Sequence, residues 1–237
     1  MKADRHEPRI NRYGNGQALA EALSADIAAA LQTSIERDGT AVLAVSGGST
    51  PRHMFEALSR TKIDWSNVTV TLVDERFVPP SHERSNHRLV ATFLLQNEAA
   101  FAQFIPLYGE GLSAPEAAAN AAAKIDALEK PIDVAVLGLG TDGHTASWFP
   151  GSPELAAVTS VEQEKTVMAV EAPGIPEARL TLALPALRQA QTVVLHIEGK
   201  EKRDVLEKAL EPGPVEALPV RAILRQTKQP LQVYWSP

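Results

Sequence analysis

Apolar runs and segments of helical periodicity alternate along this chain from residue 17 to its end. Leucine and isoleucine recur at every fourth position over residues 17–36, which predicts an amphipathic helix that ends at Asp38-Gly39. Runs rich in valine, alanine and leucine predict buried strands at 40–45, 68–73, 134–137 and 192–197. Further strands are expected at 104–107, 166–170, 179–184 and 231–235, and further helices at about 51–58, 86–94, 113–129, 199–210 and 219–224.

This order of elements predicts an α/β protein. Strands that alternate with helices imply βαβ crossovers, which produce a doubly wound, mainly parallel, Rossmann-like sheet flanked by helices. The sequence contains no internal repeat and no linker long enough to divide it, so we expect a single α/β domain over residues 1–237. Residues 1–14 are polar and include Pro8 and Gly14, and we expect them to form an irregular or edge segment.

Composition narrows the possible partners and chemistry. The 237 residues are 44% hydrophobic and 22% charged, as in an ordinary soluble globular protein. The net charge of −6 argues against nucleic acid or an anionic membrane as a partner. The absence of cysteine excludes thiol nucleophiles, disulfides and cysteine-ligated zinc. Neither a signal-like apolar segment nor a run of about 18 apolar residues is present, so we expect a cytoplasmic protein. We also expect a monomer rather than an oligomer.

The stretch after the apolar run 134–137 is the main candidate for an active-site loop. It contains glycines at positions 138, 140 and 143, and it places Asp142 and His144 in that flexible turn. In open α/β sheets, ligands bind at the carboxyl ends of the strands, which is where this loop lies. The alternative is a tight turn with two solvated polar residues.

Three other predicted strands also end in polar residues. Ser46-Gly47-Gly48-Ser49 joins a strand to a helix with Pro51 in its first turn, and Ser49 or Thr50 could cap that helix. Such a turn can bind an anion through backbone N–H groups, although it can also be a plain turn, and it lacks the Gly-Lys-Ser/Thr ending of a Walker P-loop. The other two ends are Asp74-Glu75-Arg76 and Glu198-Gly199-Lys200-Glu201-Lys202. Together the four ends indicate a phosphate pocket beside an acid–base centre, and hence a small phosphorylated metabolite.

The sequence argues against two other kinds of site, one for a dinucleotide and one for a metal ion. Gly138-x-Gly140-x-x-Gly143 has the spacing of a dinucleotide-binding motif, and Glu171 could serve as the ribose-binding acid. Proline and glycine at 150, 151 and 153 interrupt the helix that this motif needs, which argues against a nucleotide. His82 and His87 are five positions apart, which is the wrong spacing for one helical face, so we expect surface residues and no metal site.

The motif series resembles that of the 6-phosphogluconolactonase family. The resemblance runs in order from about residue 15 to the C-terminus. It is carried by Ser46-Gly-Gly-Ser-Thr-Pro51, Asp74-Glu-Arg-Phe-Val78, Ser85-Asn86, Gly138-Leu-Gly-x-Asp-Gly-His-Thr-Ala-Ser-x-Phe-Pro150 and Arg179-Leu-Thr181. Related glucosamine-6-phosphate deaminases typically have Asp-Glu-Tyr in place of Asp74-Glu75-Arg76, and a Glu-containing Phe-Asn-Glu-Pro segment in place of residues 147–150. Trp148 departs from the lactonase pattern, in which a smaller aliphatic residue is usual.

The resemblance implies a sugar-phosphate isomerase/lactonase type of fold and hydrolysis of 6-phospho-D-glucono-1,5-lactone to 6-phospho-D-gluconate in the oxidative pentose phosphate pathway. No metal or redox cofactor is implied, because an activated lactone needs only modest help. A histidine with a pKa near 6.5 can take a proton from water at neutral pH, so we assign His144 as general base. Asp142 or another carboxylate would set its tautomer, and Arg76 would polarise the substrate or stabilise the oxyanion.

The remaining assignments concern the substrate. The expected phosphate ligands are the turn Ser46, Gly47, Gly48 and Ser49, with Arg179 and Lys202. Lys202 is preferred to Lys200 because it matches the family's Gly-x-x-Lys spacing, whereas Arg179 could also be an ordinary surface arginine. Asp74 and Glu75 are expected to bind sugar hydroxyls, and Asn86 is included in the substrate site. The alternatives are a glucosamine-6-phosphate deaminase/isomerase-like enzyme or a non-catalytic sugar-phosphate-binding protein.

Overall fold

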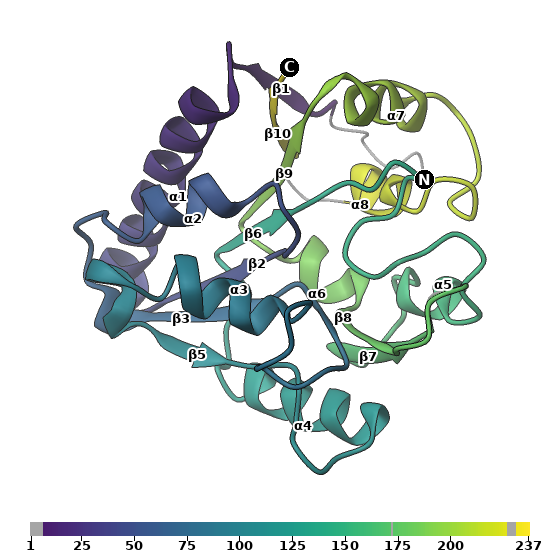
Figure 1. Ribbon diagram of the computed structural model, residues 1–237, viewed down its shortest axis with the longest axis horizontal. Coiled ribbons are helices and arrows are strands. Elements are labelled where there is room, and N and C mark those ends of the chain that lie inside the picture. The colour runs from purple at the N-terminus through teal and green to yellow at the C-terminus, as the bar shows by residue number, and fades with distance from the viewer. Residues whose placement is uncertain (1–6, 172, 227–230) are drawn as a thin grey trace.

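The centre of the molecule is a seven-stranded sheet in which every neighbouring pair is parallel (Figure 1). The computed structural model describes residues 7–171, 173–226 and 231–237. The strand order is β1-β10-β9-β6-β2-β3-β5. These strands are β1 (Arg9–Arg12), β2 (Ala41–Val45), β3 (Val68–Leu72), β5 (Gln103–Ile105), β6 (Val134–Leu137), β9 (Thr192–Glu198) and β10 (Gln232–Ser236).

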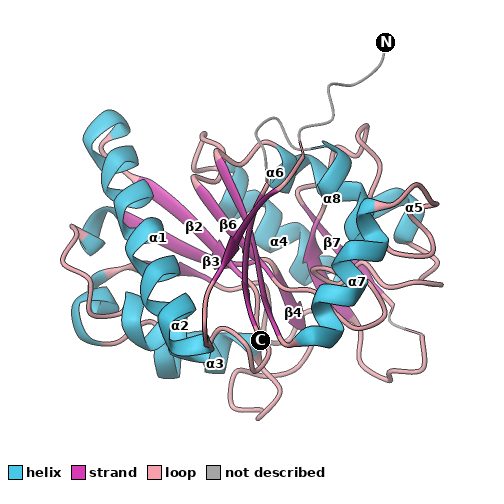
Figure 2. Cartoon of the chain, turned by 90° about the horizontal axis from the view of Figure 1, so that it is seen from above, coloured by secondary structure: helices cyan, strands magenta, loops and turns pink. Residues whose placement is uncertain are grey.

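Helices cover both faces of this sheet. α1, α2 and α3 lie on one face, and α4, α6, α7 and α8 lie on the other (Figure 2). This arrangement confirms the doubly wound α/β prediction. The helices are α1 (Gly16–Asp38), α2 (Arg52–Leu58), α3 (Asn86–Phe93), α4 (Ala114–Asp126), α5 (Leu155–Val158), α6 (Leu184–Arg188), α7 (Lys200–Leu210) and α8 (Val220–Gln226), with short 3-10 turns at Trp65–Asn67 and Asn97–Phe101.

The apolar patterns of the sequence explain these layers. Every residue of β2, β3 and β6 is buried, as continuous apolar runs require when helices cover both faces of a sheet. α1 buries the stripe that its four-residue repeat predicts: Leu19, Leu23, Ile27 and Leu31. It begins where the side chain of Asn15 accepts the Ala18 N–H at 2.9 Å, and it ends at Gly39, whose φ of +79° suits glycine.

A second sheet, of three antiparallel strands, packs at the carboxyl ends of the parallel strands. It consists of β4 (Asp74–Arg76), β8 (Arg179–Leu182) and β7 (Val167–Val170), in the order β4-β8-β7. Val73 connects the two sheets: its N–H donates to Val45 O at 2.9 Å, and its carbonyl accepts the Leu182 N–H at 2.8 Å. The predicted strands at 166–170 and 179–184 are therefore present, but they pair outside the parallel sheet.

The structure also tests several local predictions from the sequence. Of the N-terminal segment expected over residues 1–14, Arg9–Arg12 form β1 at the edge of the sheet, and residues 1–6 lie outside the described part of the chain. The strand expected at 104–107 spans Gln103–Ile105. The expectation that Ser49 or Thr50 caps the second helix is wrong, because Pro51 occupies that position and no side chain caps it. Within the described ranges, no helix combines the length and apolarity that a membrane span requires.

Trp148 anchors the loop that follows β6. Its side chain is fully buried, and its indole Nε1 donates to Leu182 O of β8 at 3.0 Å. Its backbone N–H donates to Thr145 O at 3.0 Å, which closes the turn behind His144. The larger residue at this position therefore fills the junction between the loop and the small sheet.

We predict that Trp148→Ala lowers the free energy of unfolding by about 3–5 kcal/mol, since it leaves a large cavity and removes the indole hydrogen bond to Leu182 O. Urea denaturation measures this loss. Phe101→Ala is the control: that ring is 73% exposed, so its removal should change stability by no more than about 0.5 kcal/mol. Equal stabilities for the two variants would contradict the anchoring role.

Candidate active site

A pocket of about 250 Å³ opens at the carboxyl ends of β2, β3, β6 and β9. It lies at the point where the strand order reverses. After β2 the chain forms β3 on one side of β2, and it later forms β6 on the other side of β2. Such switch points are where open α/β sheets bind ligands. All four polar strand ends of the sequence contribute to the lining, which includes residues 46–51, Asp74, Arg76, Asn86, residues 136–140, His144, Ala146, His196 and Lys202.

His144 and Asp142 form a close pair on the loop after β6. The ring Nδ1 lies 2.5 Å from Asp142 Oδ1, and the backbone N–H of His144 donates to the same oxygen at 3.1 Å. A proton shared with the carboxylate at Nδ1 leaves Nε2 as the ring nitrogen that can accept another. Burial alone would raise the pKa of Asp142, but the hydrogen bond and charge of His144 outweigh it and hold that pKa below its ordinary value.

The backbone of this loop holds the pair in place. Gly140 N–H donates to His144 O at 2.8 Å, and Val220 N–H of α8 donates to Gly143 O at 3.0 Å. A side chain at position 140 would not fit, because a Cβ there would lie 2.1 Å from His144 Nδ1. Ala146 has a φ of +51°, which a non-glycine residue adopts at some cost in energy.

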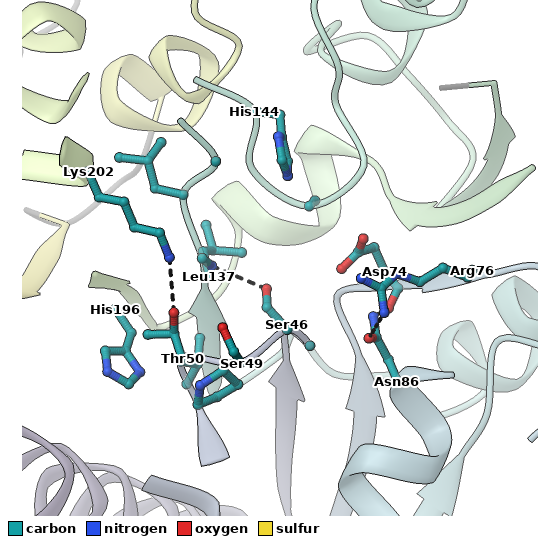
Figure 3. Close-up of a pocket in the computed structure, with 18 residues that line it drawn as sticks. Ser46, Ser49, Thr50, Asp74, Arg76, Asn86, Leu137, His144, His196 and Lys202 are labelled. Carbon is teal, nitrogen blue, oxygen red and sulfur yellow. Dashed lines mark hydrogen bonds between the residues drawn. The ribbon is translucent and has the colours of Figure 1, made fainter. Parts of the chain in front are cut away.

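Arg76 is held on the opposite side of the pocket from Lys202 (Figure 3). Its Nη1 donates to Asn86 Oδ1 at 2.9 Å and to Arg84 O at 2.6 Å. Asn86 Nδ2 in turn donates to Asp74 O at 2.8 Å, so both ends of this amide already have partners. Asp74 Oδ2 accepts the hydroxyl of Ser147 at 2.6 Å. The guanidinium thus has a fixed position from which it can face a negatively charged oxygen.

The turn after β2 and Lys202 of α7 form the basic end of the pocket. Lys202 Nζ donates to Thr50 Oγ1 at 3.0 Å, and burial lowers the pKa of this lysine. Lys200 points away: its side chain is 83% exposed and its Nζ pairs with Asp204 at 2.5 Å. The structure therefore places Lys202, and not Lys200, at the pocket. In Figure 3 His144 points from its loop toward the space between this end and Arg76.

Two predicted substrate residues do not line the pocket. Glu75 is completely buried and accepts hydrogen bonds from the chain around Asn86, so the expectation that it binds sugar hydroxyls is wrong. Arg179 is 4% exposed, which also excludes an ordinary surface arginine. Its Nη2 lies 3.5 Å from Glu177 Oε1, and its guanidinium carbon lies 5.8 Å from the centre of the Phe149 ring. Burial lowers the pKa of Arg179, and the nearby charge of Arg76 lowers it further.

His196 lines the pocket and was missed from the sequence. It is 2% exposed on β9, with Nε2 3.2 Å from Glu198 Oε1, and its buried Nδ1 has no hydrogen-bond partner among the described residues. A lone polar residue inside the apolar run 192–197 was the available signal. His87, expected at the surface, is instead half-buried against the Phe104 ring, with 4.7 Å between ring centres. Across the described ranges, His, Asp and Glu nowhere gather in the groups of three that could hold a metal ion.

Known proteins resemble this chain over nearly its whole length. The family model described as glucosamine-6-phosphate isomerases/6-phosphogluconolactonase matches residues 14–235. A 6-phosphogluconolactonase of Rhizobium meliloti (strain 1021) is 52% identical over 95% of this chain and 97% of that protein. One from Pseudomonas aeruginosa is 43% identical over 95% and 93%. The crystal structure of a 6-phosphogluconolactonase from Shewanella baltica OS155 covers 98% of both chains, with a TM-score of 0.94 and 40% identity.

A monomeric glucosamine-6-phosphate deaminase of the NagB superfamily shares the fold as well. That structure covers 96% of this chain, with a TM-score of 0.77 and 19% identity. At this level of identity the likeness concerns the fold alone.

We predict that Gly140→Ala separates His144 from Asp142, because the added methyl group would lie 2.1 Å from Nδ1 and 2.5 Å from Oδ1. Without that hydrogen bond the pKa of Asp142 should rise above its wild-type value, which an NMR titration of the carboxyl carbon can follow. Gly138→Ala is the matched control, since a Cβ there meets nothing within 4 Å. An unchanged pKa in Gly140→Ala would refute this description of the pair.

Proposed function

Because this chain belongs to the family of glucosamine-6-phosphate isomerases and 6-phosphogluconolactonases, we propose that it hydrolyses 6-phospho-D-glucono-1,5-lactone to 6-phospho-D-gluconate, a step of the oxidative pentose phosphate pathway. The observation that carries this proposal is the 52% identity to a 6-phosphogluconolactonase along almost the full length of both chains. The pocket supports it, because a histidine–aspartate pair and two fixed cations surround one small cavity.

In this proposal His144 is the general base. Its Nε2 removes a proton from water as the water oxygen attacks the lactone carbonyl carbon, and Asp142 stabilises the imidazolium that forms. Arg76 faces the negative charge that develops on the carbonyl oxygen. The bond from that carbon to the ring oxygen then breaks, and the proton on His144 passes to the ring oxygen. The products are the carboxylic acid and a hydroxyl group, and the enzyme returns to its starting state.

The phosphate binds at the other end of the pocket. Lys202 offers a charged donor already oriented by Thr50, and the Ser46–Ser49 turn offers hydroxyl and backbone donors. Arg179 lies outside the lining and pairs with Arg76 across β4 and β8, on the side opposite Lys202, so it is not assigned to the phosphate. Asp74 lines the pocket beside Arg76 and is assigned to the sugar hydroxyls.

Residues 147–150, in the loop after β6, argue against the deaminase alternative. Phe149 stands where the deaminase segment typically carries its Glu, and its ring packs against His144 with 4.6 Å between the ring centres, so this chain has no carboxylate at that position. Release of ammonia from glucosamine-6-phosphate would favour this alternative. Tight binding of the sugar phosphate without turnover would favour a non-catalytic binding protein. We further propose that the reaction needs no metal or redox cofactor and that the protein acts as a cytoplasmic monomer, with neither nucleic acid nor membrane as a partner.

We predict that the purified protein accelerates loss of enzymatically generated lactone above its spontaneous rate. His144→Ala should lower kcat by about 10²-fold or more, the usual effect of losing a general base, with little change in phosphosugar binding. The control is His53→Ala, because His53 is exposed on α2 and does not line the pocket. A His144→Ala enzyme with wild-type turnover would remove His144 from the mechanism.

We also predict that Lys202→Gln raises KM by about 10- to 10²-fold while kcat changes less, since a charged hydrogen bond to phosphate contributes about 1.5–3 kcal/mol. Steady-state kinetics over a range of lactone concentrations separates the two constants. Lys200→Gln should behave as wild type, because that ammonium points to solvent and pairs with Asp204. Equal KM values for both lysine variants would contradict the phosphate assignment.

A further inference from the structure

We propose that Glu75 is a positioning residue for the reaction: its carboxylate fastens the first turn of α3 to β4 and thereby fixes the Asn86–Arg76 pair at the pocket. The inference rests on the proposed function, in which Arg76 faces the developing oxyanion. Glu75 does not line the pocket and is completely buried, so it acts through its neighbours and not on the substrate.

Both oxygens of Glu75 are fully engaged. Oε1 accepts the backbone N–H groups of Arg76 at 2.8 Å and Asn86 at 2.7 Å. Oε2 accepts the backbone N–H of His87 at 2.7 Å and the hydroxyl of Ser85 at 3.0 Å. One donor belongs to β4 and the other three to the start of α3, so a single carboxylate bridges the strand and the helix.

This bridge determines where Arg76 lies. Asn86, the first residue of α3, accepts Arg76 Nη1 at 2.9 Å and donates to Asp74 O at 2.8 Å. Gly47 packs against the same amide so closely that a Cβ at position 47 would lie 1.8 Å from Asn86 Oδ1. The side-chain amide of Asn86 is therefore confined to a single position, provided that Glu75 holds the backbone N–H of Asn86.

A charged carboxylate suits this position better than its neutral isostere. Burial raises the pKa of Glu75, while the three backbone N–H groups and the Ser85 hydroxyl favour the anion and oppose that effect. In Glu75→Gln the amide NH₂ would face Ser85 and the His87 N–H, which is itself a donor. One backbone donor would lose its acceptor inside the protein, and the helix start would move away from β4.

The test compares the wild-type protein with Glu75→Gln in the lactone assay. We expect kcat to fall by about 10- to 10²-fold, because a small displacement of a catalytic group has effects of this size, while KM, set mainly at the Lys202 end, stays close to wild type. The side-chain NMR signals of Arg76 should shift in isotope-labelled Glu75→Gln. The matched control is Asp133→Asn, another buried carboxylate, which accepts the Val42 N–H at 2.7 Å at the opposite end of the sheet. It should lose stability but keep both kinetic constants.

The outcomes separate the two proposals. A wild-type protein without lactonase activity counts against the proposed function, and the Arg76 signals then test the positioning role alone. An active wild type with unchanged kcat and unchanged Arg76 signals in Glu75→Gln overturns the positioning role. If Glu75→Gln does not fold, Ser85→Ala removes one of the four donors and should lower kcat to a smaller extent at constant KM. Equal losses of kcat in Asp133→Asn would also overturn the inference.

Discussion

The pairing of β2 with β3 on one side and β6 on the other determines where the polar groups of the pocket lie. Val45 is in register with Leu72 of β3 and with Val136 of β6. Backbone hydrogen bonds continue this register beyond the strands, from Ser46 to Val136 O and from Val73 to Val45 O, both at 2.9 Å. The residues that follow the three strands must therefore emerge side by side at one edge of the sheet. The turn at Ser46, Asp74 and the loop of His144 meet there although they are far apart in sequence.

Much of this arrangement could be predicted from the sequence, because it depends on two local signals. A short apolar run indicates a strand that is buried on two faces, and the polar residues just after it indicate the carboxyl edge of the sheet. The positions of Ser46, Arg76 and His144 at one pocket follow from those two signals. The preference for Lys202 comes from the family's Gly-x-x-Lys spacing alone, because both lysines lie in the first turn of α7 and only the structure shows that Lys200 points outward.

The rest depends on pairings between distant residues, which a single sequence does not display. β4 has three residues, and its partner β8 lies about a hundred positions later, with Arg76 opposite Arg179. Once β4 is known to be a strand, alternation of side chains puts Asp74 and Arg76 on one face and Glu75 on the other. Without that knowledge, three consecutive charged residues look equally able to bind substrate. His196 was missed for a related reason, because its place in the same pocket as Lys202 depends on how β9 and α7 pack.

The two carboxylates behind the pocket have different effects because their hydrogen-bond donors differ. Asp142 is half exposed, and its partner is the imidazole of His144, which can carry a proton on either ring nitrogen. Its charge therefore favours a proton on the ring nitrogen that faces it. Glu75 is buried, and most of its donors are backbone N–H groups that cannot titrate. Its charge can only hold the chain in one geometry. One carboxylate thus influences where the proton resides, and the other influences where the guanidinium of Arg76 resides, so the proposed attack on a lactone depends on both.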